Sequence, residues 1–320
     1  MPQTLNQPNQ LSAIQPSDAT FMNVPFMSVP IMNTPVTKAT GQAKAIILGL
    51  PFDCGSDPAR IGARFGPNSI RQQSRLISPF DGASNINPLT TLNVQDIGDV
   101  EVDLASIDKT YTLIEQAMDQ VIQRAAVPIS LGGDGSVALP QMRALAKTYP
   151  DLVVIHIDAH TDAYPLSEYS NATPFTHAVH ERLIDPHNSF HVGRRGSHFV
   201  PNVVSYCKEL GYNLIDMQEL LSRGIDETFA RIKAQIGNRA VYLCFDMDFF
   251  DPCVAPGVCS PTFGGATSRE GLQLIRACEG LNIVAADINT ISPPHDVSGV
   301  SALLAATVSY EILLLLAKKF

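Results

Sequence analysis

The stretch "LVVIHIDAHTDAY", residues 152–164, decides the fold prediction because a short apolar run ends directly in a cluster of polar residues. An apolar run of this length is typical of a buried β-strand, in which alternate side chains point to the same face. Asp158, His160 and Asp162 occupy alternate positions, and all three are residue types that bind metal ions. The stretch therefore predicts a strand that ends at a metal site.

Similar apolar runs alternate with helical segments between residue 44 and the C-terminus. Strands are also expected at 43–53, 91–98, 127–134, 189–195, 213–217, 240–248 and 282–288, and helices at 66–77, 106–126, 136–149, 201–210, 226–236, 268–280 and 299–318. This alternation is typical of the α/β class, with a mostly parallel sheet that helices cover on both faces. No repeat or linker interrupts residues 44–320, which we interpret as one domain.

Residues 1–43 differ in composition from the rest of the chain. They are rich in Pro, Gln, Asn, Thr and Met, carry few charges, and show no helical or strand period. We interpret them as an irregular N-terminal extension. Two hypotheses are open for this extension: an arm that lies across a neighbouring subunit, suggested by apolar residues spaced along 21–32, or a tail that has no fixed partner.

The composition excludes several classes of partner. The net charge is −9, and the 22 Lys and Arg residues form no dense basic run, which argues against nucleic acid.

The six cysteines form no CxxC motif and no secretory signal opens the chain, so we expect reduced thiols and a cytoplasmic location. The apolar stretch at 311–320 is shorter than a membrane span, and we expect a helix docked on the core instead.

Three polar clusters follow predicted strands, namely "GGDGS" at 132–136, "DAHTD" at 158–162 and "DMDFFDP" at 246–252. In open parallel sheets, binding sites gather at the carboxyl ends of the strands, so we expect the three clusters to share one cleft. Asp246 and Asp248 alternate in the same way as the residues after 157. Four carboxylates and one imidazole make a ligand set that suits Mn²⁺ or Ni²⁺ better than a thiolate-preferring ion.

The same carboxylates predict a nearby positive charge. Two carboxylates about 4 Å apart repel each other by about 4 kcal/mol at an effective dielectric constant of about 20. Three explanations are open: a metal ion lies among them, a Lys or Arg side chain reaches in, or some of the carboxyl groups keep their protons.

Six motifs occur in the order found in one enzyme family, the ureohydrolases, which includes arginase and agmatinase. The motifs are "LPFDCGSDPARIGARFGPNSIR" (50–71), "LGGDGS" (131–136), "DAHTDAY" (158–164), "TPF" (173–175), "FDMDFFDPCVAPG" (245–257) and "SPPHD" (292–296). The resemblance implies a three-layer α/β/α sandwich that assembles into trimers or hexamers. It also implies a centre of two metal ions, usually manganese and in some members nickel, at which a bridging hydroxide attacks a guanidinium carbon and urea leaves.

The sequence departs from the family pattern at three places. Gly135 occupies the position of a histidine that ligates the first metal ion in the family, and glycine has no ligating side chain. Asn171 and Ala172 stand where the family has a histidine motif that helps to move protons, and an amide is no acid or base near neutral pH. Thr290 stands at the position of a glutamate that holds the guanidinium in many members, and a hydroxyl cannot replace that bidentate pairing.

These departures affect ligation, proton transfer and substrate anchoring together, while the scaffold motifs are kept. The chain therefore resembles the degenerate, non-catalytic subunit of a heteromeric guanidine or biguanide hydrolase of the nickel-dependent metformin hydrolase kind. Its expected partner is a catalytic paralogue in a mixed trimer or hexamer, and that paralogue carries both metal ions. On this hypothesis the chain itself holds one divalent ion, nickel or manganese, at a residual site, or none.

Two other hypotheses are open. A site with one metal ion on Asp158, His160, Asp246 and Asp248 could still activate water, which would make the chain a remodelled amidino hydrolase. A chain that binds a guanidino ligand without turning it over would be a sensor. The candidate metal ligands of the chain are Asp158, His160, Asp162, Asp246 and Asp248.

Overall fold

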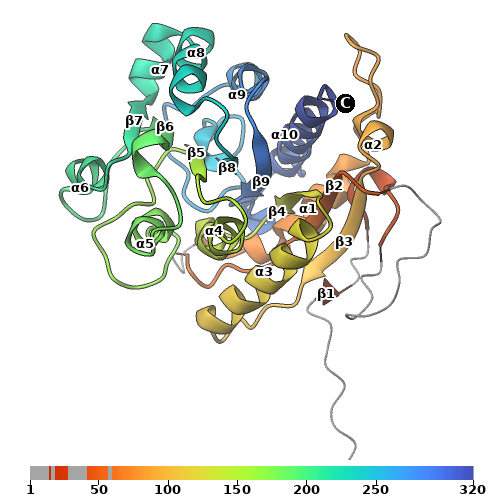
Figure 1. Cartoon of the computed structure of the whole chain (residues 1–320), viewed down its shortest axis with the longest axis horizontal. Coiled ribbons are helices and arrows are strands. Elements are labelled where there is room, and N and C mark those ends of the chain that lie inside the picture. Colours follow the sequence, from red (N-terminus) through yellow and green to blue (C-terminus); the bar gives the residue numbers. More distant parts are fainter. Residues whose placement is uncertain (1–13, 16–18, 28–41, 57–59, 320) are drawn as a thin grey trace, which may run out of the picture.

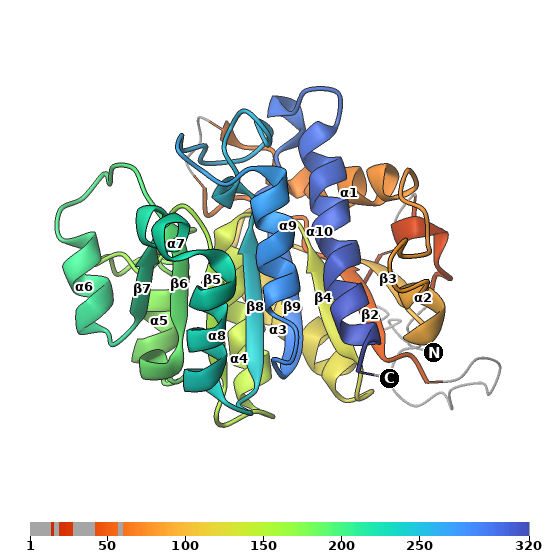
Figure 2. The ribbon, with the colours of Figure 1, turned by 90° about the horizontal axis from the view of Figure 1, so that it is seen from above.

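Runs of aliphatic and aromatic residues form a nine-stranded sheet, and helices cover both of its faces (Figures 1 and 2). The structure, a computed structural model, describes residues 14–15, 19–27, 42–56 and 60–319. The strands are β1 (Ile14–Gln15), β2 (Ala45–Gly49), β3 (Gln95–Val100), β4 (Val127–Leu131), β5 (Val153–Ile157), β6 (Phe190–Arg194), β7 (Asn213–Asp216), β8 (Val241–Asp246) and β9 (Ile283–Asn289). Every residue of β2, β5, β8 and β9 is buried, as expected for strands that are covered on both faces.

The strand order places four strand ends side by side. The order is β1-β3-β2-β4-β9-β8-β5-β6-β7, in which β1 pairs antiparallel with β3 and the other eight strands run parallel. The loops after the adjacent strands β4, β9, β8 and β5 therefore meet at one edge of the sheet. The predicted three-layer α/β/α sandwich with a mostly parallel sheet is confirmed.

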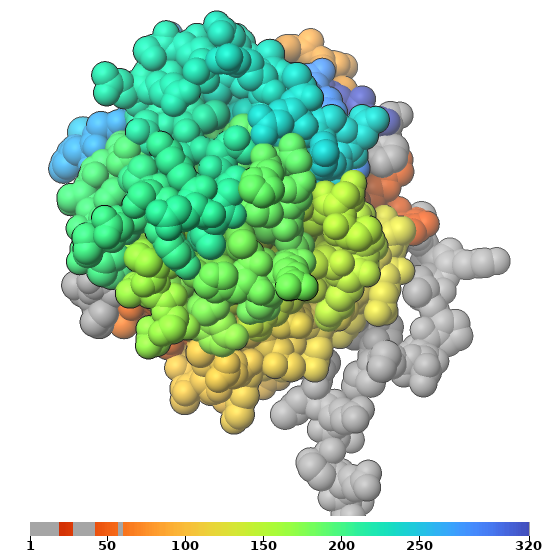
Figure 3. All heavy atoms as spheres, turned by 60° about the vertical axis from the view of Figure 1, so that its left-hand side comes forward, coloured from red at the N-terminus to blue at the C-terminus, as the bar shows by residue number. Residues whose placement is uncertain are grey.

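Two helical layers enclose the sheet. The helices are α1 (Gly66–Ser74), α2 (Pro88–Thr91), α3 (Ile107–Ile122), α4 (Ala138–Ala146), α5 (Pro174–His180), α6 (Val203–Glu209), α7 (Met217–Arg223), α8 (Ile225–Ile236), α9 (Ser268–Ala277) and α10 (Val300–Ala317). One layer holds α3, α4, α5 and α6, and the other holds α1, α7, α8, α9 and α10 (Figure 2). In the space-filling view, the residues of α5 to α8, coloured green to teal, cover much of the face that is shown (Figure 3).

The predicted elements differ from the structure at several points, which include the absence of α5 and β1 from the prediction. The strand expected to reach His160 ends at Ile157, and the strand expected to reach Asp248 ends at Asp246. The sequence analysis missed α7, because this helix begins directly after β7 without a loop to separate the two periodic patterns. The single-turn helix α2 was also missed, since four residues are too few for a helical period to show.

Part of the N-terminal extension packs on its own chain. Phe21, Met22 and Val24 are buried, and the main-chain N–H of Phe21 donates a hydrogen bond of 2.8 Å to Asp96 Oδ2. The N–H of Met22 donates to Ser74 Oγ at 2.7 Å, so this segment is held against β3 and α1. Residues 1–13, 16–18 and 28–41, over which the arm hypothesis extends, lie outside the described residues.

The C-terminal helix α10 is longer than the apolar stretch that predicted it. Among the described residues, it is the one helix long and apolar enough to cross a membrane by length and composition, and 78% of it is buried within the fold. It packs against α1 and α9 on one face of the sheet, which confirms the expected docking on the core (Figure 2). The length that could span a membrane belongs to the whole helix from Val300, as expected at 299–318, and not to the stretch at 311–320 alone.

A row of polar side chains crosses the sheet beneath the strand ends. Ser130, Asp287, Cys244, His156 and His191 are register partners on β4, β9, β8, β5 and β6 in turn, so their side chains share one face. All five are buried. The row lies inside the strands, just before the carboxyl ends at which the candidate site is found.

Asp287 is the acidic member of this row. Its Oδ2 accepts hydrogen bonds from Tyr242 Oη at 2.8 Å and from Gln141 Nε2 at 2.8 Å, while Oδ1 is buried without a partner. Burial raises the pKa of Asp287 from 3.8 to about 7, so the folded chain holds a proton that the unfolded chain has released. Ionising Asp287 therefore costs the folded state progressively more as the pH rises from about 4 to about 7.

We expect the stability of Asp287→Asn, relative to that of the native chain, to increase as the pH rises. Between pH 5 and pH 8, the free energy of unfolding of the variant should improve relative to the native chain by on the order of 2 kcal/mol, because the asparagine never ionises. Urea unfolding at both pH values measures this difference. The exposed Asp151→Asn serves as a control that should show no such change. A difference between the Asp287 variant and the native chain that is equal at both pH values would contradict the prediction.

Candidate metal centre

The end of β8 and the loops after β5 and β8 carry the predicted ligands to one edge of the sheet, next to the loop after β4 that holds Gly135. Asp158, His160 and Asp162 follow the end of β5, so strand alternation does not bring them together, and that part of the prediction is wrong. The loop conformation does so instead: Asp162 has a φ of +46°, a left-handed conformation that the short polar side chain of Asp tolerates. After β4, Gly132 has a φ of +76°, and an ideal Cβ on it would lie 2.4 Å from Pro67 Cδ, so the turn there requires glycine.

A cavity of about 640 Å³ opens at this edge. Four of the five predicted ligands line it, together with the three positions at which the sequence departs from the family pattern and with apolar side chains. The lining residues include Gly135, His160, Asp162, Tyr164, Leu166, Glu168, Asn171, Ala172, His198, Phe199, Asp246, Asp248 and Thr290. Asp158, the fifth predicted ligand, lies behind this surface and is buried.

His160 lies between two of the predicted carboxylates. Its Nδ1 is 3.2 Å from Asp158 Oδ1 and 3.2 Å from Asp248 Oδ2. Its Nε2 is 3.3 Å from Thr262 Oγ1, which steadies the other side of the ring. Asp158, His160 and Asp248 each offer one ligand atom, and these atoms lie within 4.8 Å of one another. The structure therefore brings three of the five predicted ligands into one group.

Asp246 is engaged differently from the other carboxylates. Its Oδ1 accepts hydrogen bonds from the hydroxyl of Thr290 and from the main-chain N–H of Asp248. Thr290 has a φ of +66°, which is a strained conformation for a β-branched residue. The strained backbone directs the Thr290 hydroxyl onto Asp246, so the residue at the family's anchoring position is tied to a predicted metal ligand.

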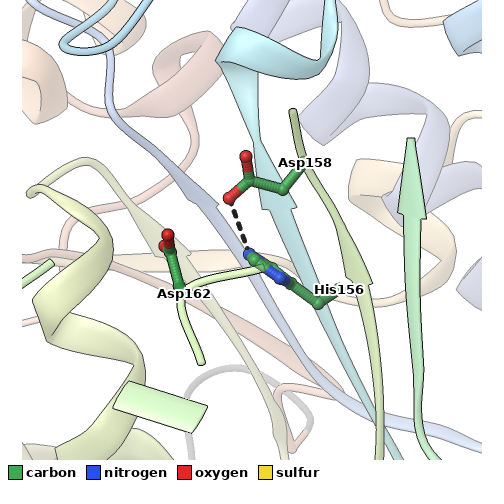
Figure 4. A group of neighbouring side chains, drawn as sticks. All are labelled: His156, Asp158 and Asp162. Carbon is green, nitrogen blue, oxygen red and sulfur yellow. Dashed lines mark ion pairs between the residues drawn. The ribbon is translucent and has the colours of Figure 1, made fainter. Parts of the chain in front are cut away.

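His156 belongs to the site, although the sequence analysis did not select it. It lies inside β5, and its Nε2 is 2.8 Å from Asp158 Oδ2 (Figure 4). His156, Asp158 and Asp162 form a second group whose ligand atoms lie within 4.8 Å of one another. A signal was present, since His156 alternates with Asp158 and His160, but an imidazole in an apolar run is most simply explained as part of a strand core.

Burial and mutual repulsion govern the charge of the carboxyl groups. Burial and the neighbouring Asp158 raise the pKa of Asp162 well above its usual value, and raise that of Asp248 to about 6. Burial and Asp248 raise the pKa of Asp246 in the same way. Asp158 behaves oppositely: although burial opposes it, His156 and His160 hold the pKa of its carboxyl well below the usual value. The Asp158 carboxylate thus stays ionised between two imidazoles, while its neighbours hold their protons to a higher pH than usual.

No Lys or Arg in the described part of the chain forms an ion pair with the five predicted ligands. The buried Arg195 lies close by, but its guanidinium donates to the main-chain carbonyls of Asp248, Phe250 and Thr262. None of these cations pairs directly with a predicted ligand, although the charge of Arg195 acts on Asp248, Asp158 and Asp246 from nearby. Retained protons and the imidazole of His160 offset part of the repulsion, and a bound cation is the other explanation that stays open.

Gly135 faces the carboxylates. An ideal Cβ on Gly135 would lie 2.8 Å from Asp162 Oδ2 and 3.2 Å from the main-chain oxygen of Asn171. A side chain at this position would therefore point to the group that contains Asp162. Because glycine has none, the position contributes no ligand, and the Asp162 carboxylate occupies the space next to it.

The region at Asn171 contains no substitute for the missing histidine. Asn171 and Ala172 line the cavity, whereas His177 and His180 do not. Both histidines lie on α5, where His177 Nε2 is 3.5 Å from the main-chain oxygen of Glu168 and His180 Nε2 is 3.4 Å from Tyr206 Oη. Neither imidazole reaches the carboxylates from the described position.

The donor set fits one divalent cation better than two in the family arrangement. Asp158, His160 and Asp248 supply two carboxylates and an imidazole within ligand reach of a common point, a set that suits Mn²⁺ or Ni²⁺. The first ion of the family arrangement would lack the nitrogen ligand that position 135 supplies in the family. A cation at the remaining group would also relieve the repulsion that raises the pKa of Asp248.

Comparisons with known proteins agree with the fold and the motif order. Residues 43–315 match the family described as "Arginase family". The chain belongs to the arginase family. It is 33% identical over 304 residues to a mitochondrial agmatinase of Gallus gallus, covering 94% of this chain and 89% of that protein. It is 37% identical over 276 residues to a guanidinopropionase of Pseudomonas aeruginosa, covering 85% of this chain and 86% of that protein.

A solved structure also matches this chain in the arrangement of its helices and strands. The proclavaminate amidino hydrolase from Streptomyces clavuligerus superposes with a TM-score of 0.87 at 30% identity, covering 95% of this chain and 99% of that chain. As a member of the arginase family, the chain keeps the eight parallel strands and their flanking helices. Metal-binding residue types are partly retained at the strand ends, and the three departures all lie on the same cavity.

We expect Asp162→Asn to stabilise the metal-free chain. The pKa of Asp162 is raised, so ionising it costs the folded state more as the pH rises, and the neutral amide removes that cost. The gain in the free energy of unfolding should be larger at pH 8 than at pH 5. Thermal unfolding in the presence of a chelator measures it.

A divalent cation should stabilise the native chain more than it stabilises Asp162→Asn. With excess Mn²⁺ or Ni²⁺, the native chain should gain more in melting temperature than Asp162→Asn, because a nearby cation relieves the repulsion at Asp162 that the amide variant no longer has. Asp151→Asn, which changes an exposed carboxylate far from the cavity lining, should respond to the ions as the native chain does. An Asp162 variant that is less stable than the native chain in chelator at pH 8 contradicts the expected repulsion.

Proposed function

We propose that this chain is the non-catalytic subunit of a heteromeric hydrolase that acts on a guanidino compound or a biguanide. The observation that carries the proposal is the bare backbone at Gly135, which faces the carboxylate cluster at the place where the family has a ligating histidine. Without a nitrogen ligand at position 135, the family's own ligand set for the first of its two metal ions is incomplete in this chain. The bridging hydroxide that the family uses as its nucleophile needs both ions.

The two other departures support the same conclusion. The hydroxyl of Thr290 donates to Asp246, so this position presents no carboxylate to a guanidinium. Asn171 lines the cavity but cannot transfer a proton near neutral pH. Ligation, anchoring and proton transfer are therefore weakened within one cavity, whereas a change of substrate alone would need only one of these positions to differ.

The intact scaffold supports a role in assembly. The chain keeps nearly the whole length and arrangement of its relatives, with a TM-score of 0.87 to one of them, so it can occupy a subunit position in a family oligomer. We infer that its partner is a catalytic paralogue in a mixed trimer or hexamer, and that the paralogue supplies two nickel or manganese ions. Urea or a urea derivative and an amine are the expected products of that complex.

An active hydrolase with one metal ion is the second candidate. The observation that favours it is the compact group of Asp158, His160 and Asp248, whose ligand atoms lie within 4.8 Å of one another. Such a chain would bind close to one metal ion per molecule. It would lose both the ion and its turnover in Asp248→Ala, because this substitution removes one of the three ligands.

Activity measured with and without a partner tests the proposal. The full chain, loaded with Ni²⁺ or Mn²⁺, should release no urea or amine from guanidino compounds or biguanides when assayed alone. Expressed together with an intact ureohydrolase paralogue, it should co-purify with that paralogue. The complex should then hydrolyse a substrate at least about tenfold faster than the paralogue alone, a difference of about 1.4 kcal/mol in barrier height.

Turnover by the lone chain is the outcome that defeats the proposal. If the metal-loaded chain hydrolyses a guanidino compound by itself, and Asp248→Ala abolishes that activity together with the bound metal, the one-metal enzyme is correct. Failure to associate with any intact paralogue from the same source would also count against the subunit role. Both readouts concern activity and assembly, and neither depends on where in the chain an ion lies.

A further inference from the structure

His156, Asp158 and Asp162 converge on a common point beneath the cavity. Figure 4 shows the three side chains, from β5 and the loop after it, directed toward one another. His156 Nε2 lies 2.8 Å from Asp158 Oδ2, and one ligand atom of each residue lies within 4.8 Å of the other two. All three residues are buried, with exposed fractions of 1%, 1% and 8%.

One oxygen of this group lacks the hydrogen bond that burial normally demands. Asp158 Oδ2 is buried without a hydrogen bond of good geometry, and His156 Nε2 lies 2.8 Å from it. A buried acceptor without a donor costs about 1–3 kcal/mol, and more when it is charged. The Asp162 carboxylate differs, because it lines the cavity. A cation held by His156, Asp158 and Asp162 would satisfy the buried oxygen of Asp158.

We propose that His156, Asp158 and Asp162 bind a divalent cation, and that the imidazole of His156 supplies the nitrogen ligand that is missing at Gly135. One imidazole and two carboxylates form a mixed nitrogen and oxygen set, which borderline ions such as Ni²⁺, Co²⁺, Mn²⁺ and Zn²⁺ accept. The ligand comes from inside the strand, two residues before Asp158, instead of from the loop after β4. The proposal therefore assigns a role to a residue outside the five ligands that the sequence predicted.

The neighbour of His156 on β6 fixes the orientation that this role requires. His156 Nδ1 is 2.9 Å from His191 Nδ1, and the two rings meet edge to face at 86°. With Nδ1 engaged by His191, the Nε2 of His156 is left to face the carboxylates. A histidine ligand is commonly held in this way by a partner on its other ring nitrogen, which sets the tautomer and the direction of the lone pair.

The position of the group distinguishes a structural ion from a catalytic one. Asp162 lines the cavity, but His156 and Asp158 do not, so an ion held by all three lies at or behind the cavity floor. Structural metal sites are closed by protein ligands, whereas catalytic sites keep a position open for water or substrate. An ion in this place would hold β5 and its loop together and relieve the repulsion among the carboxylates. The inference does not rest on the proposed function.

Cobalt binding to the full metal-free chain tests the proposal. Co²⁺ is the probe because its visible absorption reports the ligands directly. We expect His156→Asn to weaken Co²⁺ binding by at least about tenfold and to change the spectrum of any cobalt that remains. The matched control is His180→Asn, which removes an exposed imidazole outside the cavity lining, and it should change the affinity by less than about threefold.

Crystallography of the native chain decides the case if His156→Asn fails to fold. Anomalous diffraction at the cobalt edge should place an ion about 2.1 Å from His156 Nε2. An ion found only at His160, or no bound cobalt at all, overturns the proposal. An affinity that drops in His160→Asn and is unchanged in His156→Asn does the same. These readouts are independent of turnover, so the proposal can fail while the non-catalytic role stands, or the reverse.

Discussion

The concentration of buried carboxyl groups at adjacent strand ends is the constraint on which the rest of the site depends. β4, β9, β8 and β5 run parallel and end together, so the loops after them project Asp158, Asp162, Asp246 and Asp248 into one region. Like charges in a buried site cannot all persist without compensation. The position of His160 between Asp158 and Asp248, and the raised pKa values around it, follow from this crowding.

The chain has the scaffold of the arginase family, and the positions expected to depart from the family pattern lie on its cavity. The parallel strands, their order and the covering helices are those of the arginase family, and none of the members of the two large core clusters lines the cavity. The altered positions are coupled to retained ones: the space at Gly135 adjoins Asp162, and Thr290 binds Asp246. Each loss thus changes the surroundings of a predicted ligand as well as removing a group of its own.

Much of the fold could be predicted from the sequence because buried residues recur with the period of each strand or helix. The apolar runs gave the strands and the sheet class, and the polar clusters after them gave the edge that carries the site. The errors lie where periodicity stops. Strand alternation does not extend to Asp158–Asp162, because β5 ends at Ile157 and the φ of +46° at Asp162 redirects the loop. His156 was missed because a buried imidazole within a strand looks the same in sequence whether or not it faces a site.

The sequence by itself determined the fold class, the kinds of ligand available and the absence of an imidazole at position 135. These follow from residue identity and from the two-residue period of a strand, which are local properties. Only the tertiary structure decided which atoms meet: that Thr290 engages Asp246, that His160 lies between Asp158 and Asp248, and that His156 faces Asp158. The physical reason is that these contacts join loops and strands far apart in the chain. Their geometry depends on strand register and on loop dihedral angles, which the order of residues does not reveal.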